Sequence, residues 1–229
     1  MKIRHLFLTA ASILCGSIFI SCEDFLDREP ESSISPEIYF TDASQLQSWA
    51  DKFYSAILPS SGKNSYGFYA EDKHTDNQIA SDTPNRLTKT LWKVPQDDSN
   101  WKFENIYQLN YILDNVLPKF GENLDGSQNQ ISGNLQSIRH YIGEIYFLRA
   151  LDYFNRYQKF GDFPIVEHAL TDDMEATTEA SKRSPRNEVA RFILSDLDKA
   201  ATLMDGIDFA TTRINRDLAL LLKSRVALY

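Results

Sequence analysis

Apolar positions recur at helical spacing in five stretches of the chain, each interrupted by polar residues and helix-breaking signals. The first stretch follows Asp42, which forms a capping-box pattern with Gln45 three residues later. Pro59 and Gly62 are expected to end this helix. Its apolar stripe consists of Leu46, Trp49, Ala50, Phe53, Tyr54 and Ile57.

The next two stretches predict a medium helix and a long one. The medium helix is expected to be capped by Ser99 and to stop at Pro118 and Gly121. The long helix runs over residues 135–160, and Gly161 suits the left-handed position that follows a helix. Apolar residues lie on more than one face of the long helix, so we expect it to be packed between neighbouring helices.

Two further helices are predicted in the last 50 or so residues. Ser184 and Pro185 form an N-cap and first-position pair, and Asn215 can cap the last helix. No partner helix follows the last stripe, so we expect exposed apolar surface near Tyr229. We therefore expect a purified 22–229 segment to be dimeric, aggregated or only marginally stable. The last stripe consists of Leu218, Leu222, Val226 and Tyr229.

These five stretches, with little strand-like alternation, predict an all-α fold. Successive helices suggest tetratricopeptide-like helical hairpins that stack as in a solenoid. Residues 60–98 show no sustained periodicity and predict a long irregular loop insertion, which is usually functional in a compact domain. The helical domain is expected to cover residues 37–229.

The N-terminus has the features of an export signal. Lys2 and Arg4 precede 15 uncharged residues, 6–20, which is shorter than the roughly 20 residues of a membrane-spanning helix. Ser21 and Cys22 then resemble a bacterial lipobox. The sequence thus predicts a lipoprotein signal peptide over 1–21, a lipid on Cys22 and an acidic tether over 22–36. The alternative is ordinary cleavage near Ser21, which leaves a free thiol.

Charge and cysteine content narrow the classes of partner. The formal net charge is −8, and it becomes −10 once residues 1–21 leave with two basic side chains. Such a surface argues against nucleic acid and anionic lipid headgroups as ligands. Cys15 leaves with the signal and Cys22 carries the lipid, so the mature chain has no thiol left for a disulfide.

No catalytic constellation stands out, so we predict that the protein is not an enzyme and needs no cofactor. There is no phosphate-binding loop, nucleophile elbow or cysteine pair for zinc. His140 is expected to be a partly exposed helical residue, and His168 has no nucleophile near it in sequence. One acidic cluster lacks the spacing of known metal sites, and a solvated loop is favoured there. It consists of Glu71, Asp72, His74 and Asp76.

Arg149 lies among apolar residues in the predicted long helix. It could extend along apolar surface with its guanidinium in water. We favour a structural role, in which it pairs with a buried acid such as Glu144 or Asp152.

The stretch GEIYFLRALDYFNRYQKFGDFPIV, residues 143–166, resembles the signature helix of SusD/RagB-type outer-membrane lipoproteins of Bacteroidota. Other segments agree with that family in order along the chain: CEDFLDREP, WKFENIYQLNYILDNV, RSPRNEVARFILSDLDKAATLM and INRDLALLLKSRVALY. The resemblance implies a helical, tetratricopeptide-like fold. It also implies a surface-exposed receptor that caps a SusC-like TonB-dependent transporter and holds glycans, or sometimes peptides, for import. Family members are longer, so the chain resembles their N-terminal domain alone or a truncated product.

Ligand contacts are expected in the 60–98 loop, because related proteins, by resemblance, place ligand-contacting residues in this region. Flat aromatic rings bind the C–H faces of sugars, while Asn, Asp and Arg bind the hydroxyl groups. The candidates are Trp92, Arg86, Asn85, Asp82 and Tyr69, with Trp92 first as the stacking platform. The alternative is that these aromatic residues anchor the loop to the helices. An interaction scaffold that contacts only protein, or a non-functional fragment, remains the alternative function.

Overall fold

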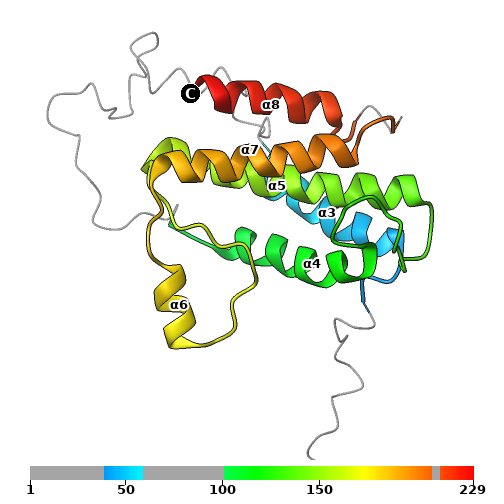
Figure 1. Ribbon diagram of the computed structural model, residues 1–229, viewed down its shortest axis with the longest axis horizontal. Coiled ribbons are helices and arrows are strands. Elements are labelled where there is room, and N and C mark those ends of the chain that lie inside the picture. Colours follow the sequence, from blue (N-terminus) through cyan, green and yellow to red (C-terminus); the bar gives the residue numbers. More distant parts are fainter. Residues whose placement is uncertain (1–38, 59–100, 208–211) are drawn as a thin grey trace, which may run out of the picture. The chain divides into compact units, whose positions relative to one another are not determined.

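The computed structural model describes residues 39–58, 101–207 and 212–229. Within these ranges the chain forms helices joined by irregular segments, with two isolated β-bridges, which confirms the predicted all-α class. The helices are α3 (Ala43–Ile57), α4 (Glu104–Phe120), α5 (Leu135–Phe160), α6 (Met174–Ala180), α7 (Arg186–Leu203) and α8 (Arg216–Leu228) (Figure 1). The predicted loop insertion at 60–98 lies outside the described residues.

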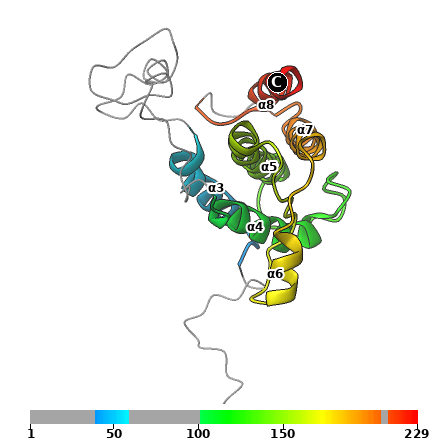
Figure 2. The same ribbon diagram turned by 90° about the vertical axis from the view of Figure 1, so that its left-hand side faces the viewer.

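Helix α5 is the centre of the domain. It contacts α3 and α4 on one side and α7 on the other, and α8 packs mainly on α7 (Figure 2). Consecutive long helices α5, α7 and α8 run in alternating directions, as expected for stacked helical hairpins (Figure 1). This central position explains why α5 is buried along most of its faces, as its sequence predicts.

Local signals define the ends of α3 and α5. The carboxylate of Asp42 accepts a hydrogen bond from the Ser44 amide at 2.8 Å, and Gln45 accepts one from the Asp42 amide at 3.2 Å. This completes the predicted capping box. Helix α5 spans residues 135–160 as predicted, and Gly161 follows it with a φ of 70°.

Two predicted boundaries differ from the structure. Helix α4 starts at Glu104, and Ser99, its expected cap, lies outside the described residues. Helix α4 continues through Pro118 but ends at Phe120, with Gly121 as its C-cap, so only the Gly121 part of the predicted stop is confirmed. Phe120 is fully buried, and the Gly121 amide donates to the Leu117 carbonyl at 2.8 Å. The packing of Phe120 and the hydrogen bond from Gly121 thus stabilise the last turn, although Pro118 has no backbone N–H to donate.

Helix α7 begins one residue later than predicted. Its N-cap is Pro185 and its first residue is Arg186. The backbone of Ser184 instead exchanges two hydrogen bonds with that of Phe163, at 3.1 and 3.2 Å. This β-bridge joins the residue before α7 to the segment after α5. Ser184, which was expected to cap α7, is therefore paired with Phe163.

Helix α6 is absent from the sequence-based prediction. It has only seven residues and none of them is buried, so no apolar stripe marks it. The Asp173 carboxylate caps it by accepting from the Ala176 amide at 2.9 Å.

Helix α8 leaves apolar side chains exposed, as its sequence predicts. Leu222 and Val226 are buried against the domain, whereas Leu218 is 38% and Tyr229 is 55% exposed. The expected association or marginal stability of a purified segment remains a prediction. None of the helices in the described ranges is long and apolar enough to cross a membrane.

Candidate functional site

The residues predicted to carry function lie outside the described part of the chain. This holds for the lipid-attachment residue Cys22 and for all five ligand candidates, which therefore stay predictions. The acidic cluster at 71–76, for which a solvated loop is favoured, also lies outside the described residues. Within the described ranges, no group of three or more His, Cys, Asp or Glu side chains could hold a metal ion. The ligand candidates are Trp92, Arg86, Asn85, Asp82 and Tyr69.

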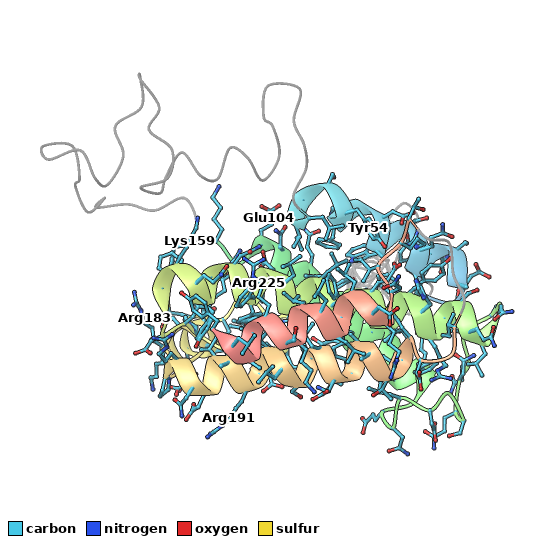
Figure 3. The ribbon with its side chains drawn as sticks, turned by 90° about the horizontal axis from the view of Figure 1, so that it is seen from above. Tyr54, Glu104, Lys159, Arg183, Arg191 and Arg225 are labelled. Carbon is cyan, nitrogen blue, oxygen red and sulfur yellow. The ribbon has the colours of Figure 1, made fainter. Side chains whose placement is uncertain are left out.

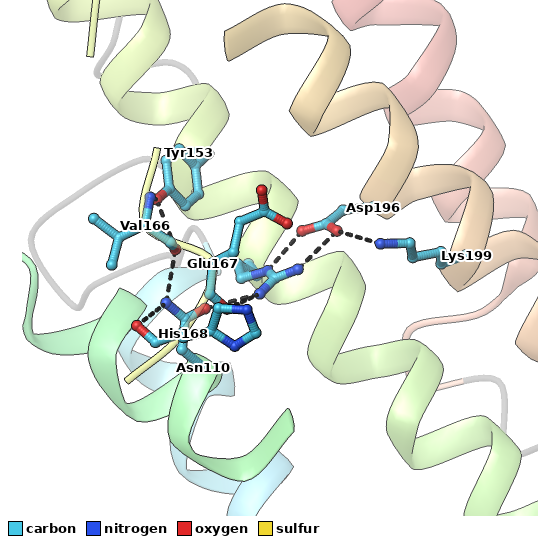
Figure 4. A network of polar contacts seen from close by, with 8 residues as sticks. Asn110, Tyr153, Val166, Glu167, His168, Asp196 and Lys199 are labelled. Atoms are coloured by element: carbon cyan, nitrogen blue, oxygen red, sulfur yellow. Dashed lines mark hydrogen bonds and ion pairs between the residues drawn. The ribbon is translucent and has the colours of Figure 1, made fainter. Parts of the chain in front are cut away.

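A buried polar network is centred on Arg149 (Figure 4). The Arg149 guanidinium donates two parallel hydrogen bonds to the Asp196 carboxylate, at 2.7 and 2.9 Å. It donates a third to the Asn110 side-chain oxygen at 2.8 Å. The predicted structural role of Arg149 is therefore confirmed.

The expected partners of Arg149 were wrong. Glu144 binds Arg213, and Asp152 binds Arg156 one helical turn away. Asp196 comes from α7, which packs directly on α5. It is the one acid within the buried stripe of α7, between Ile193 and Leu197, and this position was the available sequence signal.

Two opposing effects act on the pKa of Arg149. Burial alone would lower the pKa of Arg149, but the adjacent Asp196 carboxylate outweighs it, and the pKa is raised. Lys199 adds a second positive charge 3.8 Å from Asp196, nearer the surface. Burial also raises the pKa of Tyr146, whose ring lies under the guanidinium, to about 12. The Arg149 guanidinium therefore keeps its positive charge inside the network.

The network fixes the backbone that follows α5. Arg149 donates to the Glu167 carbonyl at 3.2 Å, and Asn110 donates to the Val166 carbonyl at 2.7 Å. The Tyr153 hydroxyl accepts from the Val166 amide at 2.8 Å. The segment 166–168 is therefore held from both α4 and α5, although it belongs to no helix.

A small cavity of about 180 Å³ lies between this segment, α4 and α6. Its lining includes Tyr107, Val166, His168 and Leu170. Tyr107 is 46% exposed, and the His168 ring binds the Asp114 carboxylate at 2.8 Å. The volume is below the roughly 300–1,000 Å³ of pockets that enclose a drug-sized ligand, so this cavity suits one small apolar group.

This cavity has no arrangement for covalent catalysis among the described residues. The Ser181 hydroxyl, which lines it, donates to the Thr178 carbonyl at 2.7 Å. His168 faces Asp114, and no described hydrogen bond joins His168 to a hydroxyl group. Nucleophilic catalysis requires a base within hydrogen-bond reach of the nucleophile. The arrangement can bind a group but shows no means of activating one.

A second buried network ties α3 to the end of the α7–α8 connection. Glu144 accepts two hydrogen bonds from Arg213, at 2.8 and 2.6 Å, and one from the Tyr54 hydroxyl at 2.8 Å. His140 lies 2.9 Å from the same carboxylate and is only 1% exposed. The expectation of a partly exposed His140 was wrong, because its ring faces Glu144 one turn along α5.

The comparison with known families covers nearly the whole chain. A SusD-like family, described as "Starch-binding associating with outer membrane", matches residues 24–228. The chain belongs to this SusD-like family. The predicted family is confirmed, and a family described by binding agrees with the predicted absence of enzymatic activity.

The chain corresponds to only part of its curated relatives. SusD-like protein P38 of Formosa agariphila is 26% identical over 204 residues, which are 87% of this chain and 37% of the relative. SusD-like protein P25 of the same organism is 29% identical over 189 residues, covering 74% of this chain and 32% of the relative. The SusD-like chain described here thus spans about a third of the length of these relatives.

A solved structure agrees with the fold. A SusD-like protein from Bacteroides fragilis matches 88% of this chain and 38% of its own, with a TM-score of 0.53 and 21% sequence identity. This likeness shows that the two chains share a fold over most of the present chain.

Proposed function

We propose that this SusD-like protein is a surface lipoprotein of the outer membrane that binds a glycan for uptake. The glycan is an oligosaccharide derived from starch or another polysaccharide, and a SusC-like TonB-dependent transporter takes it up. The main support for the proposal is the family match over residues 24–228. The description of that family names both starch binding and the outer membrane. A peptide is the alternative cargo.

The N-terminal sequence supports the membrane part of the proposal. A lipid on Cys22 would anchor the protein, and the acidic segment 22–36 would separate the helical domain from the membrane. The net charge of −10 without the signal disfavours direct adhesion to anionic lipid headgroups. The lipid is thus the proposed link to the outer membrane, with the domain facing the cell surface.

The ligand contacts are proposed for the segment that precedes α4. Trp92 would stack on a sugar ring, and Asn85, Arg86 and Asp82 would bind its hydroxyl groups. Tyr69 would supply a second aromatic face. Multiple weak contacts of this kind suit a receptor that must release its cargo to a transporter.

Affinity electrophoresis tests the proposed function. The 22–229 protein, with Cys22→Ala to keep it free of lipid, is run in native gels with and without soluble starch or other polysaccharides. We expect retardation in at least one polysaccharide gel, relative to a non-binding protein of similar charge. An unchanged mobility in every gel would favour the alternative of a protein-binding scaffold or a fragment without function.

One observation favours the scaffold as the second candidate function. An apolar groove lies beside α8, and the apolar face of a partner helix can fill a groove of this kind. A scaffold would show no retardation in the gels and would bind a helical peptide instead.

A further inference from the structure

The cavity between α4, α6 and the segment after α5 has a firm apolar wall on the side of α4. Phe103, the N-cap residue of α4, lines the cavity and stacks on Phe163, with the two ring centroids 5.1 Å apart. Trp101 contacts both of these rings edge-on, at 5.9 and 4.9 Å. Ile106, which also lines the cavity, is fully buried. These contacts leave the wall little freedom to move.

The buried network around Arg149 holds the wall formed by the segment after α5. The side-chain amide of Asn110 donates to the Val166 carbonyl at 2.7 Å and to the His168 carbonyl at 3.3 Å. Arg149 donates to the Glu167 carbonyl between them. Val166 and His168 both line the cavity, so the network fixes their backbone beside α4. A cavity with walls fixed in this way needs little reordering to bind a ligand.

His168 adds a hydrogen-bond acceptor to the lining of this cavity. Its Nδ1 lies 2.8 Å from one oxygen of Asp114, and the other oxygen accepts from the Ala169 amide at 2.7 Å. A carboxylate only accepts, so Nδ1 carries the hydrogen, and in the neutral imidazole Nε2 then has the free lone pair. None of the hydrogen bonds among the described residues engages Nε2, and the His168 side chain is 81% exposed. Nε2 can therefore accept a hydrogen bond from a ligand.

The size and the apolar walls of the cavity favour an aromatic ring over a sugar. The volume is about 180 Å³. An engineered apolar cavity of about 150 Å³ in another protein binds benzene, so one six-membered aromatic ring fits here. A sugar ring carries hydroxyl groups on all sides, and walls such as Phe103 and Leu170 would leave several of them without partners. The cavity therefore suits an aromatic ring with a single hydroxyl group.

We infer that this cavity binds a phenolic group. The ring lies between α4 and α6, and its hydroxyl donates a hydrogen bond to Nε2 of His168. The phenol belongs either to a free small molecule or to a tyrosine side chain, which present the same ring and hydroxyl. This binding goes beyond the proposed glycan uptake, because it involves another class of ligand and none of the glycan candidates between Tyr69 and Trp92.

Three fluorinated probes that differ in one group test this inference. Ligand-observed ¹⁹F NMR measures the affinity of 4-fluorophenol, 4-fluoroanisole and fluorobenzene for the 22–229 protein with Cys22→Ala. We expect 4-fluorophenol to bind about fivefold more tightly than fluorobenzene, because only the phenol donates a hydrogen bond. The ether oxygen of 4-fluoroanisole cannot donate, so this probe should bind no more tightly than fluorobenzene. His168→Phe keeps a ring in place but removes Nε2, and it should abolish the advantage of the phenol.

Two further variants show whether the probes bind in this cavity. Ala180→Phe adds a ring to the α6 wall and should weaken all three probes, and α6 buries none of its residues, so the domain should stay folded. Arg191→Phe is the control, because Arg191 points outward from α7, on the opposite side of the domain from Glu104 at the start of α4 (Figure 3). It should leave all three affinities unchanged.

Competition identifies the source of the phenol. N-acetyltyrosinamide that displaces 4-fluorophenol assigns the group to a tyrosine side chain, and failure to displace it assigns the cavity to a free phenol. Three results would overturn the inference: no saturable binding of 4-fluorophenol, equal affinity for 4-fluorophenol and fluorobenzene, or a phenol advantage that survives His168→Phe. Binding that Ala180→Phe leaves unchanged would place the probes elsewhere and would overturn it as well.

Discussion

Arg149 of α5 and Asp196 of α7, 47 positions apart in sequence, form a two-pronged ion pair in the core of the domain. Asp196 is fully buried and Arg149 nearly so. The pair joins the two helices with the most extensive mutual packing and also holds the segment after α5.

Removal of Asp196 should be strongly destabilising. Asp196→Ala leaves the Arg149 charge buried without its carboxylate, so we expect a loss of about 3–5 kcal/mol in the free energy of unfolding. Urea denaturation followed by circular dichroism measures it. Asp198→Ala is the matched control, because Asp198 is exposed on the same helix and its surface pair with Lys223 contributes about 0–1 kcal/mol. Equal losses in the two variants would contradict the structural role of Arg149.

Glu144 should make the stability of the domain depend on pH. Burial by itself raises the pKa of Glu144, but hydrogen bonds from His140, Arg213 and Tyr54 outweigh it and hold the pKa below the usual 4.5. The folded state therefore binds its proton at lower pH than the unfolded state. This stabilisation is present above about pH 4.5 and is lost as the pH falls through the folded-state pKa.

The variant Glu144→Gln should remove this dependence. We expect it to be less stable by about 3 kcal/mol at neutral pH, because Arg213 loses a buried partner. Its stability should then decline less than that of the parent between pH 5 and pH 3. Denaturation curves across this range measure both effects, and Glu188→Gln, in the exposed first turn of α7, is the control. Parallel pH profiles for parent and Glu144→Gln would rule out this assignment.

Gly143 should be intolerant of even a methyl group. A Cβ atom there would lie 2.7 Å from Met204 Cγ and 3.2 Å from the Ala200 carbonyl oxygen. In an unobstructed helix, Gly→Ala would gain roughly 1 kcal/mol. Here we expect a net loss of about 1–3 kcal/mol in thermal or urea unfolding, because α5 and α7 must separate. Adding Met204→Ala should recover little, since the Ala200 carbonyl remains in place. A stabilised Gly143→Ala protein would show that the helices can adjust.

The lipid anchor is tested by a single substitution. Cys22→Ala should move the protein from the membrane fraction to the soluble fraction and abolish labelling with a radioactive or clickable fatty acid. Cys15→Ala, within the signal, should leave both unchanged. Membrane association of the Cys22→Ala protein at the parent's level would argue for an uncleaved signal or another anchor.

The sequence correctly predicted helix ends that depend on residues close by in the chain. The Asp42 and Gln45 capping box and the full extent of α5 are examples. The prediction failed where tertiary contacts decide. Buried Phe120 carries α4 past Pro118, and α6 has no buried face to produce a pattern.

The buried polar network around Arg149 was likewise predicted only in part. Sequence reasoning identified Arg149 as a buried charge in need of a carboxylate. It did not identify Asp196, because the choice among acids depends on which helix packs against α5. The ligand candidates were proposed from residue type and from the resemblance, and they lie in a segment outside the described residues.

Calorimetry of a sugar ligand with the parent and the Trp92→Ala protein tests whether the protein binds glycan through Trp92. The ligand is the oligosaccharide from whichever polysaccharide retards the parent in gels. We predict that Trp92→Ala loses about 1–3 kcal/mol of binding free energy, roughly tenfold or more in affinity, while its melting temperature stays that of the parent. Full affinity in a folded Trp92→Ala protein, or a binding loss that only follows a lower melting temperature, would contradict the account.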